Sequence, residues 1–248
     1  MTQDRRAQLA ANLAQVEDRI AAACAAAGRR RDEVTLIVVT KTYPASDVRL
    51  LAELGVRHVA ENRDQDAAPK AAECADLPLT WHFVGQLQTN KVRSVVSYAD
   101  VVQSVDRPKL VDALSRQADG AGRELGCLIQ VALDAEVRGS GDSGVAATGE
   151  RGGVAPEAIE ELADRIADAP GLWLGGLMTV APLAGPYAGR ERAAFERLMD
   201  FSTTLRAAHP AANMVSAGMS ADLEHAVAAG ATHVRVGTAV LGVRPRLG

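Results

Sequence analysis

The sequence is poor in aromatic residues and in cysteine, and it carries little net charge. Aromatic residues make up 3% of its 248 residues, too few for the stacking surfaces that bind single-stranded nucleic acid. The formal net charge of -4 gives no electrostatic reason to expect nucleic acid or an anionic membrane as a partner. The sequence therefore disfavours the function classes that depend on a basic surface.

Three cysteines, Cys24, Cys74 and Cys127, are scattered along the chain, and none belongs to a CxxC pair. An odd number of isolated cysteines indicates a reducing compartment rather than a disulfide scaffold. The five histidines show no metal-ligand spacing, so we expect no metal site. No apolar segment of the kind found in secretion signals follows the first ten residues, and no apolar run is long enough to span a bilayer. We therefore expect a cytoplasmic protein.

Short apolar runs alternate regularly with amphipathic helical stretches along the chain. An alanine-rich helix is predicted near 4–27. The eight candidate strands lie near 34–40, 57–61, 81–84, 100–104, 127–133, 172–178, 213–217 and 232–237. The other helical stretches lie near 45–54, 64–75, 88–97, 107–121, 155–169, 188–208 and 219–229. This alternation predicts parallel strands joined by right-handed crossovers.

Eight such units predict an α/β fold with a single domain over residues 1–248, a TIM-type (β/α)8 barrel with an extra N-terminal helix. An open doubly wound sheet is the alternative, but no GxGxxG follows the first strand. A glycine-rich insert, residues 138–153, follows the fifth predicted strand, and we expect it to be a flexible loop on the carboxyl face of the barrel.

Lys41 is the most informative residue, because it ends the apolar run 34–40, which reads as a buried strand. A lysine at the carboxyl tip of a buried strand is held close to apolar surroundings. Such lysines lose their proton and attack carbonyl groups. Lys41 is therefore a candidate for Schiff-base formation.

Two segments near the other end of the chain predict a phosphate site. Residues 216–220 read as a junction from strand to helix, in which Gly218 permits an unusual turn and Ser220 is a good N-cap. Plain helix capping also explains this segment when it is taken alone. Gly237 and Thr238 follow the eighth strand, however, and phosphate sites after strands seven and eight recur in such barrels. Together with a reactive lysine, these segments suggest a phosphorylated aldehyde as ligand.

Strand parity places Arg235 inside the barrel, because Val234 and Val236 suit packing against the outer helices. An inward arginine is costly unless a ligand or a buried carboxylate satisfies it, and the Gly-Thr that follows favours the ligand. Asn62, after the second strand, either bonds a ligand through its amide or caps the next helix. His82, a lone histidine on the third strand, more often supports a core than binds a ligand.

Taken together, the sequence resembles the family of pyridoxal 5′-phosphate (PLP) homeostasis proteins, single-domain relatives of the barrel half of alanine racemase. The resemblance covers essentially the whole chain. It rests on Val39-Thr40-Lys41-Thr42, Glu61-Asn62, Trp81-His82-Phe83-Val84-Gly85-Gln86-Leu87-Gln88-Thr89-Asn90-Lys91, Gly176-Leu177-Met178, Ser216-Ala217-Gly218-Met219-Ser220 and Val234-Arg235-Val236-Gly237-Thr238.

The resemblance implies the PLP fold type III, with the cofactor held as a Schiff base on Lys41. It implies that Asn62 lies beside the cofactor ring and that Arg235 faces the pyridine nitrogen. It further implies that the phosphate is held by Ser216, the backbone around Met219 and Ser220, and Gly237-Thr238.

The family resemblance favours a carrier over an enzyme. PLP catalysis usually needs a protonated pyridine nitrogen that faces a carboxylate, and Arg235 cannot accept that proton. Racemases of this fold share the arginine, but they also take a second acid/base residue from a C-terminal β-domain. The sequence ends at Gly248, which leaves no room for that domain. We therefore expect a non-catalytic PLP-binding protein, without catalytic residues, that stores, buffers or delivers the cofactor.

Two other hypotheses stay open. A PLP enzyme, such as a weak amino-acid racemase, would need a tyrosine or cysteine at the opposite face of the cofactor, and the sequence assigns none. A barrel aldolase would use Lys41 on a sugar phosphate. For the carrier we expect PLP-dependent apo-enzymes as partners and a monomer, since the racemase dimer interface is largely missing.

Overall fold

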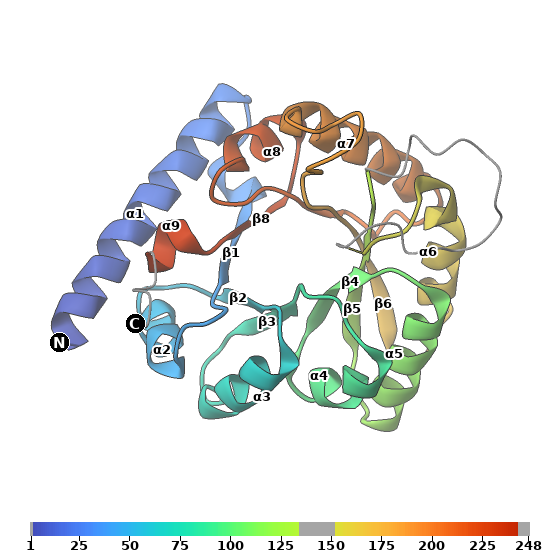
Figure 1. Cartoon of the computed structure of the whole chain (residues 1–248), viewed down its shortest axis with the longest axis horizontal. Coiled ribbons are helices and arrows are strands. Elements are labelled where there is room, and N and C mark those ends of the chain that lie inside the picture. The colour runs from blue at the N-terminus through green and yellow to red at the C-terminus, as the bar shows by residue number, and fades with distance from the viewer. Residues whose placement is uncertain (1, 134–151, 243–248) are drawn as a thin grey trace.

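Eight parallel strands close into a barrel in the order β1 to β8, with helices around it (Figure 1). This computed structural model describes residues 2–133 and 152–242. The strands are β1 Thr35–Val39, β2 His58–Glu61, β3 Thr80–Phe83, β4 Val101–Val105, β5 Leu125–Gln130, β6 Leu172–Met178, β7 Met214–Ser216 and β8 His233–Val236. The predicted barrel is confirmed, and each predicted strand overlaps an observed one.

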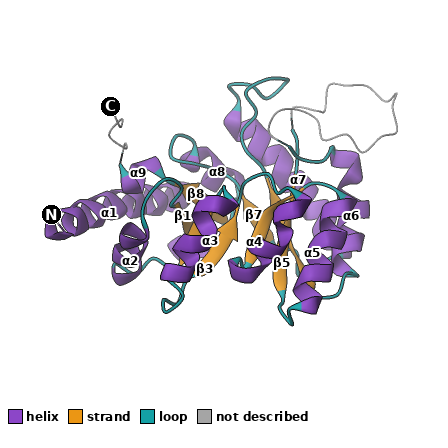
Figure 2. Ribbon diagram, turned by 60° about the horizontal axis from the view of Figure 1, so that its bottom comes forward, coloured by secondary structure: helices purple, strands orange, loops and turns teal. Residues whose placement is uncertain are grey.

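The helices cover the outside of the barrel, as Figure 2 shows in purple around the orange strands. They are α1 Thr2–Ala26, α2 Ala45–Glu53, α3 Asp64–Glu73, α4 Val92–Tyr98, α5 Pro108–Gly120, α6 Ile159–Ala167, α7 Glu191–Ala208, α8 Leu223–Ala229 and α9 Thr238–Leu241. Short 3-10 turns, η1 Arg31–Glu33, η2 Thr89–Lys91 and η4 Pro156–Ala158, complete the described elements. None of these described helices is long and apolar enough to cross a membrane.

The first and last strands pair with each other and so close the ring. The register runs from Thr35 opposite His233 to Val38 opposite Val236. Side chains alternate along β8 as the sequence predicts: Val234 and Val236 pack in the core outside the barrel, whereas Arg235 points inward. The carboxyl ends of β7, β8 and β1 therefore lie side by side, which brings residues from both ends of the chain to one edge.

The N-terminal helix α1 packs along the outside of this closure. The predicted apolar stripe is buried through Leu9, Val16, Ile20 and Cys24, in the same core cluster as the valines of β8. The helix ends before Gly28, whose φ of +66° is the left-handed conformation expected of a terminating glycine. α1 thus supports the strands that carry the predicted site.

The structure differs from the predicted elements at two points. The helix predicted near 219–229 begins only at Leu223. The short helix α9, directly after β8, was not predicted, because four residues are too few to show a helical period. Most of the glycine-rich insert, residues 138–151, lies outside the described residues.

Candidate functional site

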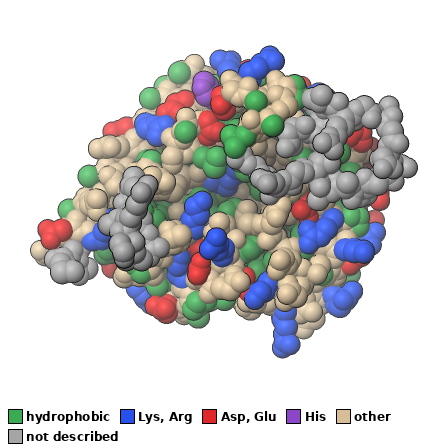
Figure 3. Space-filling model, viewed as in Figure 1, with side chains coloured by type: hydrophobic (Ala, Val, Ile, Leu, Met, Phe, Trp, Pro, Cys, Tyr) green, Lys and Arg blue, Asp and Glu red, His purple; other side chains and the backbone are tan. Residues whose placement is uncertain are grey.

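A cleft of about 560 Å³ lies at the carboxyl end of the barrel, and most of the predicted site residues line it. Blue lysine and arginine side chains gather near the middle of this face in Figure 3. The predicted residues in its lining are Lys41, Asn62, Met219, Ser220, Arg235, Gly237 and Thr238. Its described lining contains no aspartate or glutamate, so the cleft suits an anionic ligand.

Lys41 lies in the turn that follows β1, with its side chain exposed in the cleft. The next residue, Thr42, has a φ of 70°, a left-handed conformation that is costly for a β-branched residue. Apolar side chains of Val39, Val84 and Met178 line the same cleft, but they do not bury Lys41. Its amine is instead accessible to a carbonyl compound that enters from solvent.

A buried ion pair and its hydrogen bonds connect the ends of β1 and β2, next in sequence to Lys41 and Asn62. Lys70 Nζ, from α3, lies 2.5 Å from Glu61 Oε1 and 2.9 Å from the Thr40 carbonyl oxygen. The Thr40 hydroxyl donates to the same Glu61 oxygen over 2.6 Å. This link fixes the spacing of the two strand ends that carry Lys41 and Asn62.

The two segments predicted to bind phosphate come together in the structure. The Ser220 hydroxyl lies 3.4 Å from the backbone nitrogen of Ala239, the residue after Thr238. Within the described part of the chain, no hydrogen bond takes up the backbone N–H groups of Ser220, Ala221 or Thr238. These donors and two hydroxyls are the groups that a phosphate uses.

The expectation that Ser220 caps the following helix is wrong. Helix α8 begins three residues later, and its N-cap is Asp222. The Asp222 carboxylate accepts from the backbone nitrogen of Met219 over 2.5 Å. That N–H is therefore already engaged, whereas the N–H groups that follow it are not. Gly218, with φ +89°, makes the turn that the sequence predicts.

Two glycines allow close contacts between neighbouring strand ends. A Cβ on Gly237 would lie 3.1 Å from the Val39 carbonyl oxygen, where β8 meets β1. A Cβ on Gly85 would lie 2.0 Å from the Asn62 carbonyl oxygen, where β3 meets β2. Both positions line the cleft; a side chain at Gly85 would collide with the backbone, and one at Gly237 would be tightly packed against it.

Arg235 forms the inner wall of the cleft and is 4% exposed. Its Nη1 donates to Ser216 Oγ over 2.7 Å, and its Nη2 donates to the Thr179 carbonyl oxygen over 2.8 Å. Burial lowers the pKa of Arg235 to about 10. No carboxylate among the described residues forms an ion pair with it, so the alternative of a buried salt bridge does not apply.

Ser216, which the resemblance assigns to the phosphate, differs in position from the other predicted site residues, which line the cleft. Its side chain is fully buried and lies outside the lining of the cleft. Its hydroxyl donates to Gln103 Oε1 over 2.7 Å and accepts from Arg235. The structure thus places the Ser216 hydroxyl between Arg235 and Gln103, outside the lining of the cleft.

Asn62 lines the cleft, and the cap of helix α3 is the next residue, Arg63. Of the two roles that the sequence left open for Asn62, the structure therefore favours the ligand contact. His82 is buried and bonded inside the barrel, as expected of a supporting histidine.

Sequence reasoning missed several residues that line the cleft. The apolar ones are Val39, Val84, Met178 and Val180, and the others are Thr42, Tyr43, Gly85, Ala221 and Gly242. Val84, Gly85 and Met178 belong to segments that carry the family resemblance, which was the available signal. Tyr43 is the one tyrosine of the described lining, and its hydroxyl donates to the Gly242 carbonyl oxygen over 2.6 Å.

Comparison with known proteins agrees with this geometry. The alanine racemase N-terminal domain family matches residues 11–245. The pyridoxal phosphate homeostasis protein of Mycobacterium leprae is 40% identical over 96% of this chain and 94% of its own length. The Escherichia coli protein of the same name is 35% identical over 95% of this chain and 97% of its own length. The chain belongs to the pyridoxal phosphate homeostasis protein family.

Two solved structures share the barrel of this chain. PipY of Synechococcus elongatus, solved with PLP bound, superposes with a TM-score of 0.77 at 34% identity, over 94% of this chain and all of that one. An alanine racemase from Corynebacterium glutamicum gives a TM-score of 0.63 at 16% identity, over 98% of this chain and 62% of that one, and shows the shared barrel alone. The expected family and fold are thereby confirmed.

Proposed function

We propose that this protein binds PLP as a Schiff base on Lys41 and serves PLP homeostasis without catalysing a reaction. The observation that carries the proposal is the single cleft that holds an accessible lysine, a buried arginine and a set of open N–H groups. When bound, PLP supplies an aldehyde for the lysine, a phosphate and a pyridine ring. Each of these groups has a matching partner in the described lining.

The phosphate is proposed to bind at the loops after β7 and β8. The N–H groups of Ser220, Ala221 and Thr238 and the hydroxyls of Ser220 and Thr238 would hold it. The backbone N–H of Met219 donates to the Asp222 carboxylate and so stabilises the loop rather than binding the phosphate. Asn62 would lie beside the ring, in a cleft whose lining also includes the apolar side chains of Val84 and Met178.

Two features of the cleft support a carrier rather than an enzyme. The residue proposed for the ring nitrogen is Arg235, which cannot take up its proton and so disfavours the usual electron sink, although racemases of this fold share the arginine. The hydroxyl of Tyr43 is committed to the Gly242 carbonyl, so it is not a free acid or base for proton transfer. Among the described residues that line the cleft, we therefore assign none as the second acid/base group that a racemase would need.

The exposed position of Lys41 also supports reversible loading, because solvent or an acceptor protein can reach the bond to the cofactor. We therefore propose PLP-dependent apo-enzymes as recipients, and a monomeric protein that works in the cytoplasm. Size-exclusion chromatography with light scattering would check the monomer. Transfer from the purified loaded protein to an apo-enzyme, measured by the activity that the recipient regains, would check delivery.

The deciding experiment is an absorbance spectrum with added PLP, before and after borohydride reduction, followed by peptide mass spectrometry. We expect a visible band and a reduced adduct on Lys41, both lost in Lys41→Ala. The control Lys109→Ala removes a lysine of α5, outside the cleft, and should retain both signals. A wild-type protein with no band and no adduct would refute PLP binding and favour an aldolase. Rapid racemisation by the loaded protein would refute the carrier.

A further inference from the structure

A chain of hydrogen bonds crosses the barrel interior from Arg235 to the opposite wall. Arg235 Nη1 donates to Ser216 Oγ, and the Ser216 hydroxyl donates to Gln103 Oε1, each over 2.7 Å. Gln103 Nε2 lies 2.9 Å from His82 Nδ1, and His82 Nε2 lies 3.1 Å from His58 Nδ1. The chain thus starts at the cleft on β8 and passes through β7, β4 and β3 to the first residue of β2.

Arg235 sets the direction of every hydrogen bond in this chain. A guanidinium only donates, so Ser216 accepts from it and passes its own single proton to Gln103 Oε1. The Gln103 amide nitrogen then donates to Nδ1 of His82. The proton of the neutral His82 ring is thereby left on Nε2, where it is donated to His58. Burial lowers the pKa of His82 well below its ordinary value, which agrees with a neutral ring.

We propose that Ser216, Gln103 and His82 are positioning residues that hold Arg235 toward the ring nitrogen of the cofactor, an inference that rests on the proposed function. Ser216 is fully buried outside the cleft, so it acts through Arg235 and not by touching the phosphate. With the Thr179 carbonyl on its other nitrogen, the guanidinium is held from two sides by neutral acceptors.

This arrangement makes the site selective for an uncharged pyridine. No carboxylate among the described residues forms an ion pair with Arg235, and only the charge of Asp222 acts on it from a distance, so its positive charge remains available to the ligand. A ring nitrogen that accepts from this cation must have its lone pair free. A PLP analogue methylated on the ring nitrogen has no lone pair and carries a fixed positive charge, so it should bind poorly.

The test compares the affinities of PLP and its N-methyl analogue. In the wild type we expect PLP to bind at least tenfold more tightly than the N-methyl analogue. In Ser216→Ala and in Gln103→Met we expect this ratio of affinities to fall severalfold. Ser216→Thr, which keeps the hydroxyl, should restore it. Ser104→Ala is the matched control, because Ser104 is buried on the same strand as Gln103 but its hydroxyl has no partner among the described residues. A purely structural role would weaken both ligands equally and leave the ratio unchanged.

A second measurement needs neither the cofactor nor the variants. Nitrogen-15 NMR of the cofactor-free wild type should find the His82 proton on Nε2, and a proton on Nδ1 would overturn the proposed direction of the chain. If wild-type protein fails to label Lys41 with PLP, the proposed function fails. If it labels Lys41 but Ser216→Ala keeps the wild-type affinity ratio, the positioning role alone fails.

Discussion

At the scale of single residues, the ion pair of Lys70 and Glu61 lies beside two site residues. The side chain of Glu61 is fully buried and that of Lys70 is 7% exposed. Lys70 also donates to the Thr40 carbonyl, so one ammonium group ties α3 to the ends of β1 and β2. A buried carboxylate depends on such a partner, because low-dielectric surroundings penalise an unpaired charge.

Replacement of Lys70 by methionine should therefore cost about 3–5 kcal/mol in the free energy of unfolding, because it leaves Glu61 buried without its cation. Urea denaturation measures this loss. The double variant Lys70→Met with Glu61→Gln should recover a large part of it. Arg192→Gln, which removes an exposed pair with Glu196, is the control and should cost less than about 1 kcal/mol. A loss as small as that of the control would contradict the structural role of the buried pair.

At single residues, the sequence predicted side-chain direction where strands alternate and backbone conformation where a glycine stands in a turn. The inward direction of Arg235 and the left-handed turn at Gly218 are both observed. The hydrogen bond of Ser216 could not be predicted, because the partner of its hydroxyl, Gln103, lies 113 positions away on another strand. Sequence spacing does not reveal a contact of that kind across the barrel.

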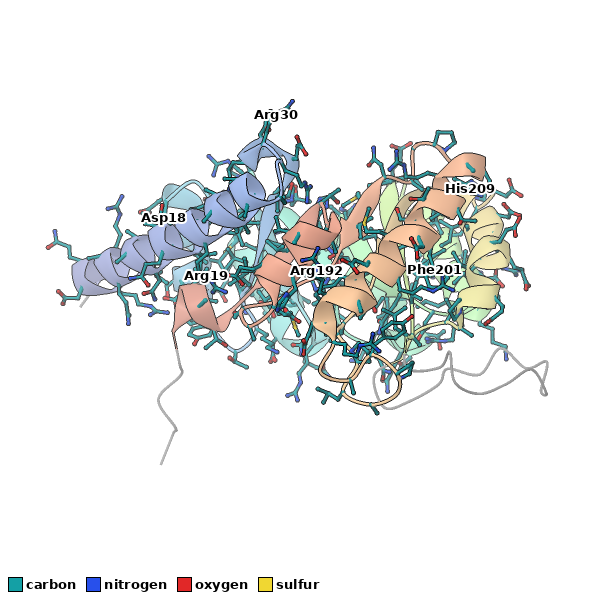
Figure 4. All side chains as sticks on the ribbon, turned by 90° about the horizontal axis from the view of Figure 1, so that it is seen from above. Asp18, Arg19, Arg30, Arg192, Phe201 and His209 are labelled. Carbon is teal, nitrogen blue, oxygen red and sulfur yellow. The ribbon has the colours of Figure 1, made fainter. Side chains whose placement is uncertain are left out.

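At the scale of elements, α1 contacts both segments proposed to hold the phosphate. Arg19 Nη2 donates to the Ser220 carbonyl oxygen over 3.0 Å and also binds Glu224 of α8. Asn12 donates to the Val240 carbonyl oxygen over 2.9 Å, in the short helix that begins with Thr238. Figure 4 shows Arg19 on α1 toward the red C-terminal elements. Helix α1 therefore supports the two loops proposed to bind the phosphate, through hydrogen bonds to their backbone carbonyl groups.

Arg19→Gln should weaken PLP binding severalfold while the protein stays folded, because the Ser220 loop loses its brace. The hydrogen bond from Arg19 also lowers the pKa of Glu224, and the variant should raise it. Fluorescence titration with PLP measures the affinity. Arg6→Gln is the control on the same helix, since Arg6 pairs with Glu53 at the surface and touches neither loop. Equal affinities of the two variants would show that α1 does not support the site.

The elements themselves were predictable because apolar runs and helical periods are local signals. The alternation of strands and helices over the chain predicted the eight-stranded barrel, which the structure confirms. The start of α8 was misplaced because Ser220 and Asp222 are both good capping residues in sequence. The choice between them is made by the turn at Gly218, which is a tertiary feature.

At the scale of the whole molecule, the barrel interior holds three histidines in surroundings that disfavour their charge. Burial lowers the pKa of His58, places that of His82 well below its ordinary value and lowers that of His233 to about 4. Unfolded histidines titrate near 6.5. Below that pH the unfolded chain binds more protons than the native one, so acid favours unfolding.

The contribution of these neutral histidines to the free energy of unfolding should therefore be complete above about pH 6.5 and be lost as the pH falls from there toward 4. Between pH 7 and pH 5 we expect a loss of about 2 kcal/mol for each strongly shifted histidine. Urea denaturation at the two values measures it. His233→Asn should reduce the pH dependence, and His225→Gln, a change at an exposed position on α8, should leave it intact. A stability that is equal at both pH values would refute neutral histidines in the native barrel.

The pairing of β1 with β8 has a consequence for how the protein acquires its cofactor during synthesis. Lys41 precedes the loops after β7 and β8 in the sequence, so a ribosome makes it well before them. Until β8 has paired with β1, the nascent chain has Lys41 but not the assembled loops that are proposed to bind the phosphate. Binding of PLP at the complete site therefore requires closure of the ring, so a cofactor held at both its aldehyde and its phosphate reports that β8 has paired with β1.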